Sequence, residues 1–130
     1  MNQVSDGELK KVIADFLEMG HAENIVAMFR REPLYYTWVG EILDDERFSV
    51  RLGLSVLFEE LKSLQPERLA LAIPSLSRVL THESSLLRGE AVGLLGIIGT
   101  HEAIELVQEM RGDPNPQVRE MVEMILEDGQ

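Results

Sequence analysis

The sequence predicts an all-α fold, an α-α superhelix in which about four antiparallel helix pairs stack as a short solenoid. Apolar residues recur with helical periodicity along almost the whole chain, whereas the alternating pattern of strands is almost absent. Glycines, prolines and short polar turns divide the chain into about eight helical segments. An arginine behind an aliphatic residue occurs three times, as Arg51, Arg88 and Arg119, at spacings of 37 and 31 residues. Such repetition is typical of stacked helical units.

The first predicted pair lies at the N-terminal end of the chain. Ser5 and Glu8 have capping-box spacing, so the first helix should begin near Asp6, and Gly20 is suited to end it. The second helix should span about residues 21–31. This pair lacks the aliphatic–arginine motif, so its assignment depends on periodicity alone. The inward-facing residues are expected to be Leu9, Ile13, Phe16, Leu17, Ala22, Ile25, Val26 and Phe29.

The second predicted pair contains a cluster of aromatic residues. Pro33 suits the first turn of its first helix. Tyr35 and Trp38 fall on the apolar face of that helix, whereas Tyr36 points elsewhere and is expected to be an exposed contact. An acidic turn at 44–45 then leads into the fourth helix. Its core stripe is expected to consist of Val50, Leu54, Leu57, Leu61 and Leu64.

Prolines and glycines mark the last four predicted helices. Pro66 should open the fifth helix, and Pro74 in its interior should kink it. The sixth helix should end near Gly99 and the seventh at Gly112. The eighth should follow the turn at 113–116. The inward-facing residues are expected to be Leu69, Ala72, Ile73, Leu76, Leu80, Leu87, Ala91, Leu94, Leu95, Ile98, Ala103, Val107, Met110, Val118, Met121, Val122 and Ile125.

Length and composition predict one domain covering residues 1–130. Hydrophobic residues make up 45% of the chain, so it can bury a core rather than remain disordered. No run approaches the roughly 18 apolar residues of a membrane helix. The N-terminus lacks the basic and then apolar pattern of a secretory signal. There are no cysteines, which excludes disulfides and cysteine-bound metals. We therefore expect a cytoplasmic protein.

The chain is strongly acidic, with 12 basic residues, 23 acidic residues and a net charge of −11. Such a surface repels phosphate backbones and anionic membranes, so we expect neither nucleic acid nor a membrane as a partner. The charge either keeps the protein soluble or indicates a partner with a basic surface. Composition leaves both interpretations open.

The repeated motif resembles the HEAT repeat, in the short form found in phycobilisome-lyase-like proteins. In that form an alanine follows Val-Arg after two residues, and a Leu-Gly pair comes next. Residues 87–96 match best, whereas Leu54 and Val122 replace the alanine in the outer copies. The resemblance covers about residues 33–127 and implies a stacked scaffold. It also implies that turn carboxylates and arginines bond to the backbone and to each other across repeats, here Asp45, Arg51, Arg88, Asp113 and Arg119.

No catalytic residue, cofactor or metal ligand is predicted. The HEAT-like deoxyhypusine hydroxylases hold two iron ions with His-Glu pairs that directly follow the helix arginine. The corresponding positions here are Leu52-Gly53, Gly89-Glu90 and Glu120-Met121. The two His-Glu pairs of this chain, at 82–83 and 101–102, lie in a turn and at a helix start. Because adjacent helical residues point about 100° apart, they do not readily chelate one ion.

A candidate binding strip lies on the second helices of the pairs, which should line the concave side of the superhelix. The arginines fix the register, so positions opposite the core stripe can be compared between repeats. Two glycines in one of these helices cost about 1 kcal/mol each relative to alanine, which indicates that bare backbone is wanted for close approach. With its acidic rim, the predicted partner-binding site consists of Leu52, Val56, Glu60, Gly89, Glu90, Gly93, Glu123 and Met124.

The sequence therefore predicts a non-catalytic protein-interaction module that binds a partner protein or a basic amphipathic segment on its concave face. Two structural alternatives stay open, because the protein's own next turn or a second copy, as a homodimer, can cover the same strip. The alternative function is an enzyme or an enzyme accessory subunit on the same scaffold, lyase-like or hydroxylase-like. Convergent His, Asp and Glu side chains on the concave face would favour it. The alternative fold is an armadillo or tetratricopeptide-like array.

Overall fold

The computed structural model describes residues 4–128, and every regular element in that range is a helix. The first pair consists of α1 (Asp6–Glu18) and α2 (Ala22–Arg31). The Ser5 hydroxyl caps α1 by accepting a hydrogen bond from the backbone N–H of Glu8, over 3.1 Å. Gly20 follows α1 with a positive φ of 82°, which glycine adopts without strain. Both predicted ends of this helix are confirmed to within two residues.

The second pair begins with two short helices in series. The 3₁₀ helix η1 (Pro33–Trp38) continues directly into α3 (Val39–Leu43), and α4 (Phe48–Leu64) then returns antiparallel to them. The predicted stripe of α4 is buried except at its end, where Leu64 is exposed. The assignment of Leu64 to the core is therefore wrong. Gln65, just after the helix, takes the inward position instead.

Tyr36 is buried, so its predicted role as an exposed contact is also wrong. A 3₁₀ helix has 3.0 residues per turn, so its residues occupy different faces from those of the α-helix that the prediction assumed. Tyr35 stays half-buried, while the ring of Tyr36 meets that of Phe29 edge-on at 5.0 Å. Its hydroxyl accepts a hydrogen bond from Gln65 Nε2 over 2.6 Å. Burial of the Tyr36 phenol raises its pKa above the ordinary value of 10.0.

The third pair repeats this arrangement. It consists of η2 (Pro66–Ala72), α5 (Ile73–Val79) and α6 (Ser85–Ile98). The prediction that Pro74 kinks a helix from within is wrong, because Pro74 lies in the first turn of α5. A proline there removes no helical hydrogen bond.

The fourth pair consists of α7 (His101–Glu109), the short 3₁₀ helix η3 (Met110–Gly112) and α8 (Pro116–Asp128). Gly99 ends α6 in the left-handed conformation, with φ 67°. Thr100 then caps α7 through its side chain. The predicted sequence of eight helices is confirmed within the described residues.

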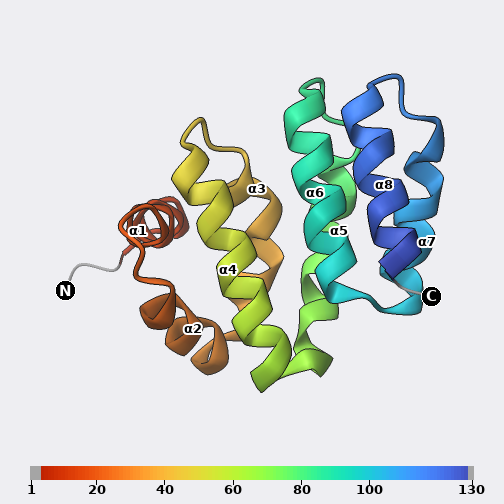
Figure 1. Cartoon of the computed structure of the whole chain (residues 1–130). Helices are drawn as coiled ribbons and strands as arrows, with labels where there is room; N and C mark the ends of the chain where they lie inside the picture. The colour runs from red at the N-terminus through yellow and green to blue at the C-terminus, as the bar shows by residue number, and fades with distance from the viewer. Residues whose placement is uncertain (1–3, 129–130) are drawn as a thin grey trace.

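The last three pairs stack into two layers, as Figure 1 shows, and α1 and α2 lie at one end of the stack. The helices α4, α6 and α8 lie side by side and run in the same direction, while α3, α5 and α7 form the layer behind them. The buried side chains form one continuous core between the layers. This arrangement confirms the predicted all-α superhelix, and the helices from α3 to α8 form antiparallel pairs. In the first pair, α1 is seen end-on in Figure 1 and lies across α4 and not antiparallel to α2, so the prediction of an antiparallel arrangement is wrong for this pair. Within the range 4–128, none of the helices is long and apolar enough to cross a bilayer.

Candidate interaction surface

Three helix arginines make the same hydrogen bond in successive turns. In each case Nη1 donates to the backbone carbonyl six residues upstream, over 2.7, 2.9 and 2.6 Å. The side chain of that turn residue accepts the backbone N–H two residues further on. Since the same bonds recur at equivalent positions, the arginines fix the turns, as predicted. The donors are Arg51, Arg88 and Arg119, and the turn residues are Asp45, His82 and Asp113.

Arg88 also joins its own repeat to the next one. Its Nε and Nη2 donate to the two carboxylate oxygens of Asp113, over 2.8 and 3.0 Å. The Asp113 side chain is only 3% exposed. The hydrogen bonds from Arg88 lower the pKa of the Asp113 carboxyl below its ordinary value of 3.8. The predicted pairing of a turn carboxylate with an arginine across repeats is confirmed at this junction.

The preceding junction lacks the equivalent bond. The residue that corresponds to Asp113 is His82, whose Nδ1 already accepts the N–H of Ser84 over 2.9 Å. Its side chain therefore offers no carboxylate to Arg51, the equivalent of Arg88. Within the described residues, Arg51 Nε is buried and has no hydrogen-bond partner. An unsatisfied buried donor costs about 1–3 kcal/mol, so this junction is weaker than the next.

We expect His82→Asp to stabilise the protein by about 1 kcal/mol. An aspartate can accept the turn N–H, as Asp45 and Asp113 do, and present a second oxygen to Arg51. Its repulsion from Asp44, whose carboxylate lies 3.5 Å from His82 Nε2 and is well exposed, should be small. Urea unfolding of the variant measures the gain. The control is His82→Asn, whose amide oxygen can accept the turn N–H but which offers no second acceptor to Arg51, so it should not raise the unfolding midpoint.

A different arginine links the first two pairs. Arg47 donates to the Asp45 carboxylate and, from Nη1, to Asp15 and Glu18 of α1 over 2.9 and 3.0 Å. The Asp45 side chain thus pairs with Arg47 and not with Arg51, which corrects the predicted pairing. The bonds from Arg47 lower the pKa of the Asp45 carboxyl below 3.8.

The predicted partner-binding residues all lie on α4, α6 and α8, the layer in front in Figure 1. The apolar members are well exposed, at 50% for Leu52, 43% for Val56 and 53% for Met124. The expectation that they face away from the core is confirmed, and their part in binding stays a prediction. We call this exposed side of the three helices the second-helix face. The polar and glycine members on it are Glu60 of α4, Gly89, Glu90 and Gly93 of α6, and Glu123 of α8.

Gly93 has no packing reason to be glycine. A Cβ built on Gly93 meets no described atom within 4 Å, and one on Gly89 would make an ordinary contact with Val118 at 3.9 Å. In contrast, a Cβ on Gly96 would lie 2.7 Å from Ile125 of α8, where the two helices approach closely. Gly96 therefore permits internal packing, whereas Gly93 leaves bare backbone on the surface.

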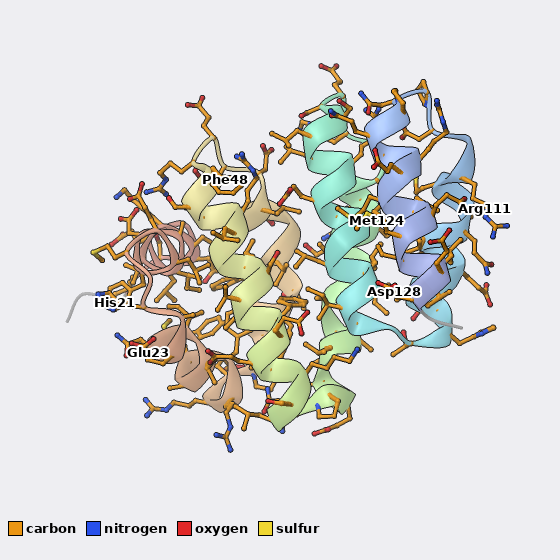
Figure 2. The ribbon with its side chains drawn as sticks, in the orientation of Figure 1. His21, Glu23, Phe48, Arg111, Met124 and Asp128 are labelled. Atoms are coloured by element: carbon orange, nitrogen blue, oxygen red, sulfur yellow. The ribbon has the colours of Figure 1, made fainter. Side chains whose placement is uncertain are left out.

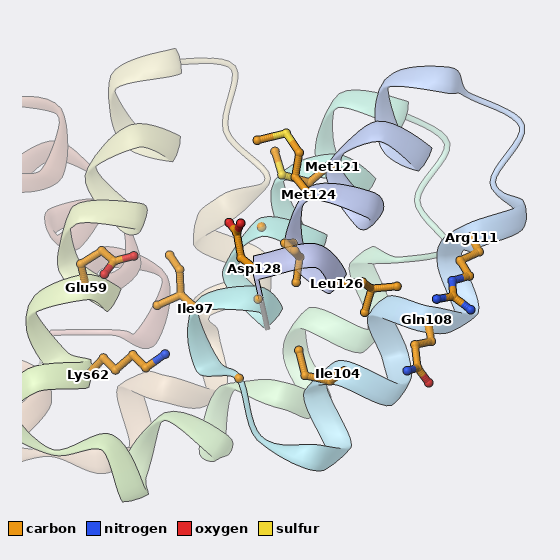
Figure 3. A pocket seen from close by; sticks show the side chains of 14 residues that line it. Glu59, Lys62, Ile97, Ile104, Gln108, Arg111, Met121, Met124, Leu126 and Asp128 are labelled. Atoms are coloured by element: carbon orange, nitrogen blue, oxygen red, sulfur yellow. The ribbon is translucent and has the colours of Figure 1, made fainter. Parts of the chain in front are cut away.

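A cavity of about 720 Å³ opens on the second-helix face toward the C-terminal ends of its helices. Of the predicted site residues, Gly93 and Met124 line it. Figure 3 shows Lys62 of α4 reaching toward it from one side and Asp128 of α8 lying above, with Ile97 between the helices. The cavity is therefore mainly apolar at its base and charged at its rim.

The second-helix face is also acidic. The helices α4, α6 and α8 carry only four basic residues, of which three are the arginines that fix the turns. The fourth is Lys62. The face can therefore attract basic groups, because few of its carboxylates have a basic neighbour. The carboxylates of the three helices are Glu59, Glu60, Glu90, Glu120, Glu123, Glu127 and Asp128.

Sequence reasoning missed several residues of this face. Phe48 begins α4 and is 64% exposed, the largest fraction among the exposed large hydrophobic side chains. Figure 2 shows it at the upper end of α4. Leu86, in the first turn of α6, is exposed as well. The comparison between repeats used only positions that follow each arginine in the sequence. Phe48 and Leu86 precede Arg51 and Arg88, so the comparison did not include them. The lining residues Lys62 and Ile97 gave no periodic signal at all.

The described side chains of the face form no cluster that is arranged for catalysis or metal binding. No group of three or more His, Asp or Glu residues between 4 and 128 is placed to hold a metal ion. His101 pairs with Glu105 on its own helix, and His82 accepts a backbone bond. The convergent cluster that would favour the enzyme alternative is therefore not among the described residues. The expected absence of cofactor and metal stays a prediction.

The comparison with protein families agrees with this geometry. The family described as HEAT repeats matches residues 37–127, from η1 to α8. The first pair, α1 and α2, lies outside the match. The match is to HEAT repeats in general, and the phycobilisome-lyase-like subtype stays a prediction. Comparisons with curated proteins and with solved structures found no match.

Proposed function

Because the chain belongs to the HEAT repeat family, we propose that it is a non-catalytic module, one domain over residues 1–130, that binds a partner protein. The binding site is the second-helix face, which is expected to be the concave side of the solenoid, and it contains the eight residues predicted from the sequence. The partner presents a basic or amphipathic surface, since the face combines exposed apolar side chains with carboxylates, of which Glu123 pairs with Arg111 and most of the others have no ion pair among the described residues. The protein works in the cytoplasm, without nucleic acid or membrane as a partner.

The observation that carries this proposal is the presence of a glycine at position 93, inside α6, where the fold does not require one. A glycine inside a helix is about 1 kcal/mol less favourable than alanine, and a Cβ at this position would find open space. The fold therefore gains nothing from this glycine. Its neighbours across the face, Val56 and Met124, are exposed apolar residues that no described side chain covers fully. A partner that approaches the backbone of α6 accounts for both features.

We expect Gly93→Arg to abolish the complex while the protein stays folded. Arginine is a better helix former than glycine, so helicity and the unfolding midpoint should not fall. The side chain nevertheless adds bulk and positive charge at the centre of the face. A photo-crosslinker at position 60 should capture the partner from native lysate with the wild-type chain, and Gly93→Arg should remove that product.

The matched control places the same change on α1, away from the second-helix face. Gly7→Arg adds an arginine at an exposed helical glycine, where a Cβ would meet only the Ser5 hydroxyl at 3.9 Å, and it should not alter capture. Sedimentation of the purified chain distinguishes a second copy from a different protein as the captured species. Equal capture of one specific product by the wild type and by Gly93→Arg would show that the second-helix face is not the binding site.

A further inference from the structure

The second-helix face has a shape that fits one more helix, with a raised row of exposed side chains on α4. Phe48, Leu52 and Val56 follow one another at intervals of four along α4, and all three are well exposed. Such a row is the ridge by which helices pack into the grooves of other helices. Here no described element covers it.

The neighbouring helix offers the complement of this ridge. Gly89 and Gly93 occupy the same positions after Arg88 that Leu52 and Val56 occupy after Arg51. On α6 this row is therefore bare, so a helix lying on the face can sit low between α4 and α8. Helix axes pack 8–10 Å apart, at the short end of that range when the contact residues are small. A ridge on α4 beside a row without side chains on α6 therefore fits a helix better than it fits a flat protein surface.

The negative charge at one edge of the second-helix face indicates that the bound helix carries basic side chains. The three helices of the face run in the same direction, so their C-terminal ends lie at one edge, as Figure 1 shows. Each C-terminus contributes a partial negative charge. Glu59 and Glu60 of α4, with Glu127 and Asp128 of α8, lie near this edge, where Lys62 is the basic side chain of the three helices. The opposite edge holds exposed Phe48 and Leu86.

We propose that the partner segment is a single amphipathic α-helix with adjacent apolar and basic stripes. Its apolar stripe packs on the ridge of Phe48, Leu52 and Val56 and extends over Leu86. Its lysines or arginines face the edge formed by the C-terminal ends of α4 and α8. This inference rests on the proposed function and adds the secondary structure of the segment that binds and its orientation on the face.

Designed peptides test the inference with the full chain. The probe is a fluorescent 18-residue helix of leucine and lysine with its leucines on one face. One control peptide has glutamate in place of lysine, and another has the same composition scrambled so that the leucines share no face. Fluorescence anisotropy at about 0.15 M salt, where the Debye length is about 8 Å, should show saturable binding of the first peptide alone.

Paired variants of the protein locate the site. Phe48→Ser with Leu52→Ser should weaken binding of the leucine–lysine peptide about tenfold or more, because it removes two exposed contact side chains. The matched control, Leu34→Ser with Leu71→Ser, alters two exposed leucines of the first-helix layer and should leave binding within about twofold. Thermal melts verify that all variants fold.

A second pair of variants tests the charge. Glu59→Lys with Glu60→Lys should weaken binding about tenfold, whereas Glu102→Lys with Glu109→Lys on α7 changes the net charge equally and should have less than about a threefold effect.

Equal weakening by both pairs, binding of the scrambled peptide, or no binding at all would overturn the helix inference. If the peptide fails while Gly93→Arg still removes the native complex, the proposed function stands and this inference falls. If the peptide binds as expected while the native complex tolerates Gly93→Arg, the proposed function falls.

Discussion

We expect Asp113→Ala to lower the free energy of unfolding by about 3 kcal/mol, the loss typical of removing one partner of a buried ion pair. The Asp113 carboxylate accepts two bonds from Arg88 and one from the backbone of Asn115. Without it, the Arg88 guanidinium, whose side chain is 14% exposed, loses its bonds to the next repeat. Urea unfolding followed by circular dichroism measures the change. Arg88→Ala breaks the same pair and should lower the unfolding midpoint too.

The control for this prediction is Glu120→Ala, an exposed carboxylate of α8 without a bond to the turns. It should shift the midpoint little. An Asp113→Ala midpoint equal to that of the wild type would contradict the structural role of the arginine–carboxylate pair. Asp113→Asn distinguishes charge from shape, since an amide oxygen can still accept the N–H of Asn115.

The pH dependence of stability follows from the same bonds. The folded state holds the pKa of the Asp113 and Asp45 carboxyls below the ordinary value of 3.8. Each therefore contributes stability that is present above pH 3.8 and is lost as the pH falls through the lower, folded-state pKa. The stability difference between the wild type and Asp113→Asn should accordingly be full at neutral pH and shrink below pH 3.8.

The fold was predictable because its signals are local and repeated. Helical periodicity, Ser5 at an N-cap and the glycines at helix ends each act over one or two turns. The errors occurred where the helix type changes. Periodicity treated residues 33–43 as one α-helix, but the first six form a 3₁₀ helix, and this places Tyr36 in the core. A change of pitch leaves no mark in a pattern of apolar residues, since both pitches accept similar spacings.

The arginine contacts were predictable only in part, for a related reason. The repeat implied a carboxylate in each turn, and Asp113 fulfils that role toward Arg88. The sequence also showed His82 at the equivalent position of the preceding turn. The consequence, an unsatisfied Nε on Arg51, depends on how two neighbouring repeats stack. The cavity near Lys62 likewise arises between helices, so spacing along one helix cannot reveal it.

Two glycine-to-alanine changes should have opposite effects on stability, and the contrast separates glycines that the fold needs from those it does not. Gly40 of α3 lies against α5, and its N–H donates to the Ser75 hydroxyl over 2.6 Å. A methyl group there would press on the Ser75 backbone, whose carbonyl carbon would be 2.9 Å away.

Because backbone atoms cannot move aside cheaply, Gly40→Ala should destabilise the protein by on the order of 3 kcal/mol. Gly93→Ala should instead stabilise it by about 1 kcal/mol, since the methyl group enters open space and alanine favours the helix. Urea unfolding measures both changes. A loss of stability with Gly93→Ala would reveal an internal reason for this glycine and remove the main support for a partner there. If the variant is more stable but binds its partner less well, Gly93 is kept for binding at the expense of stability.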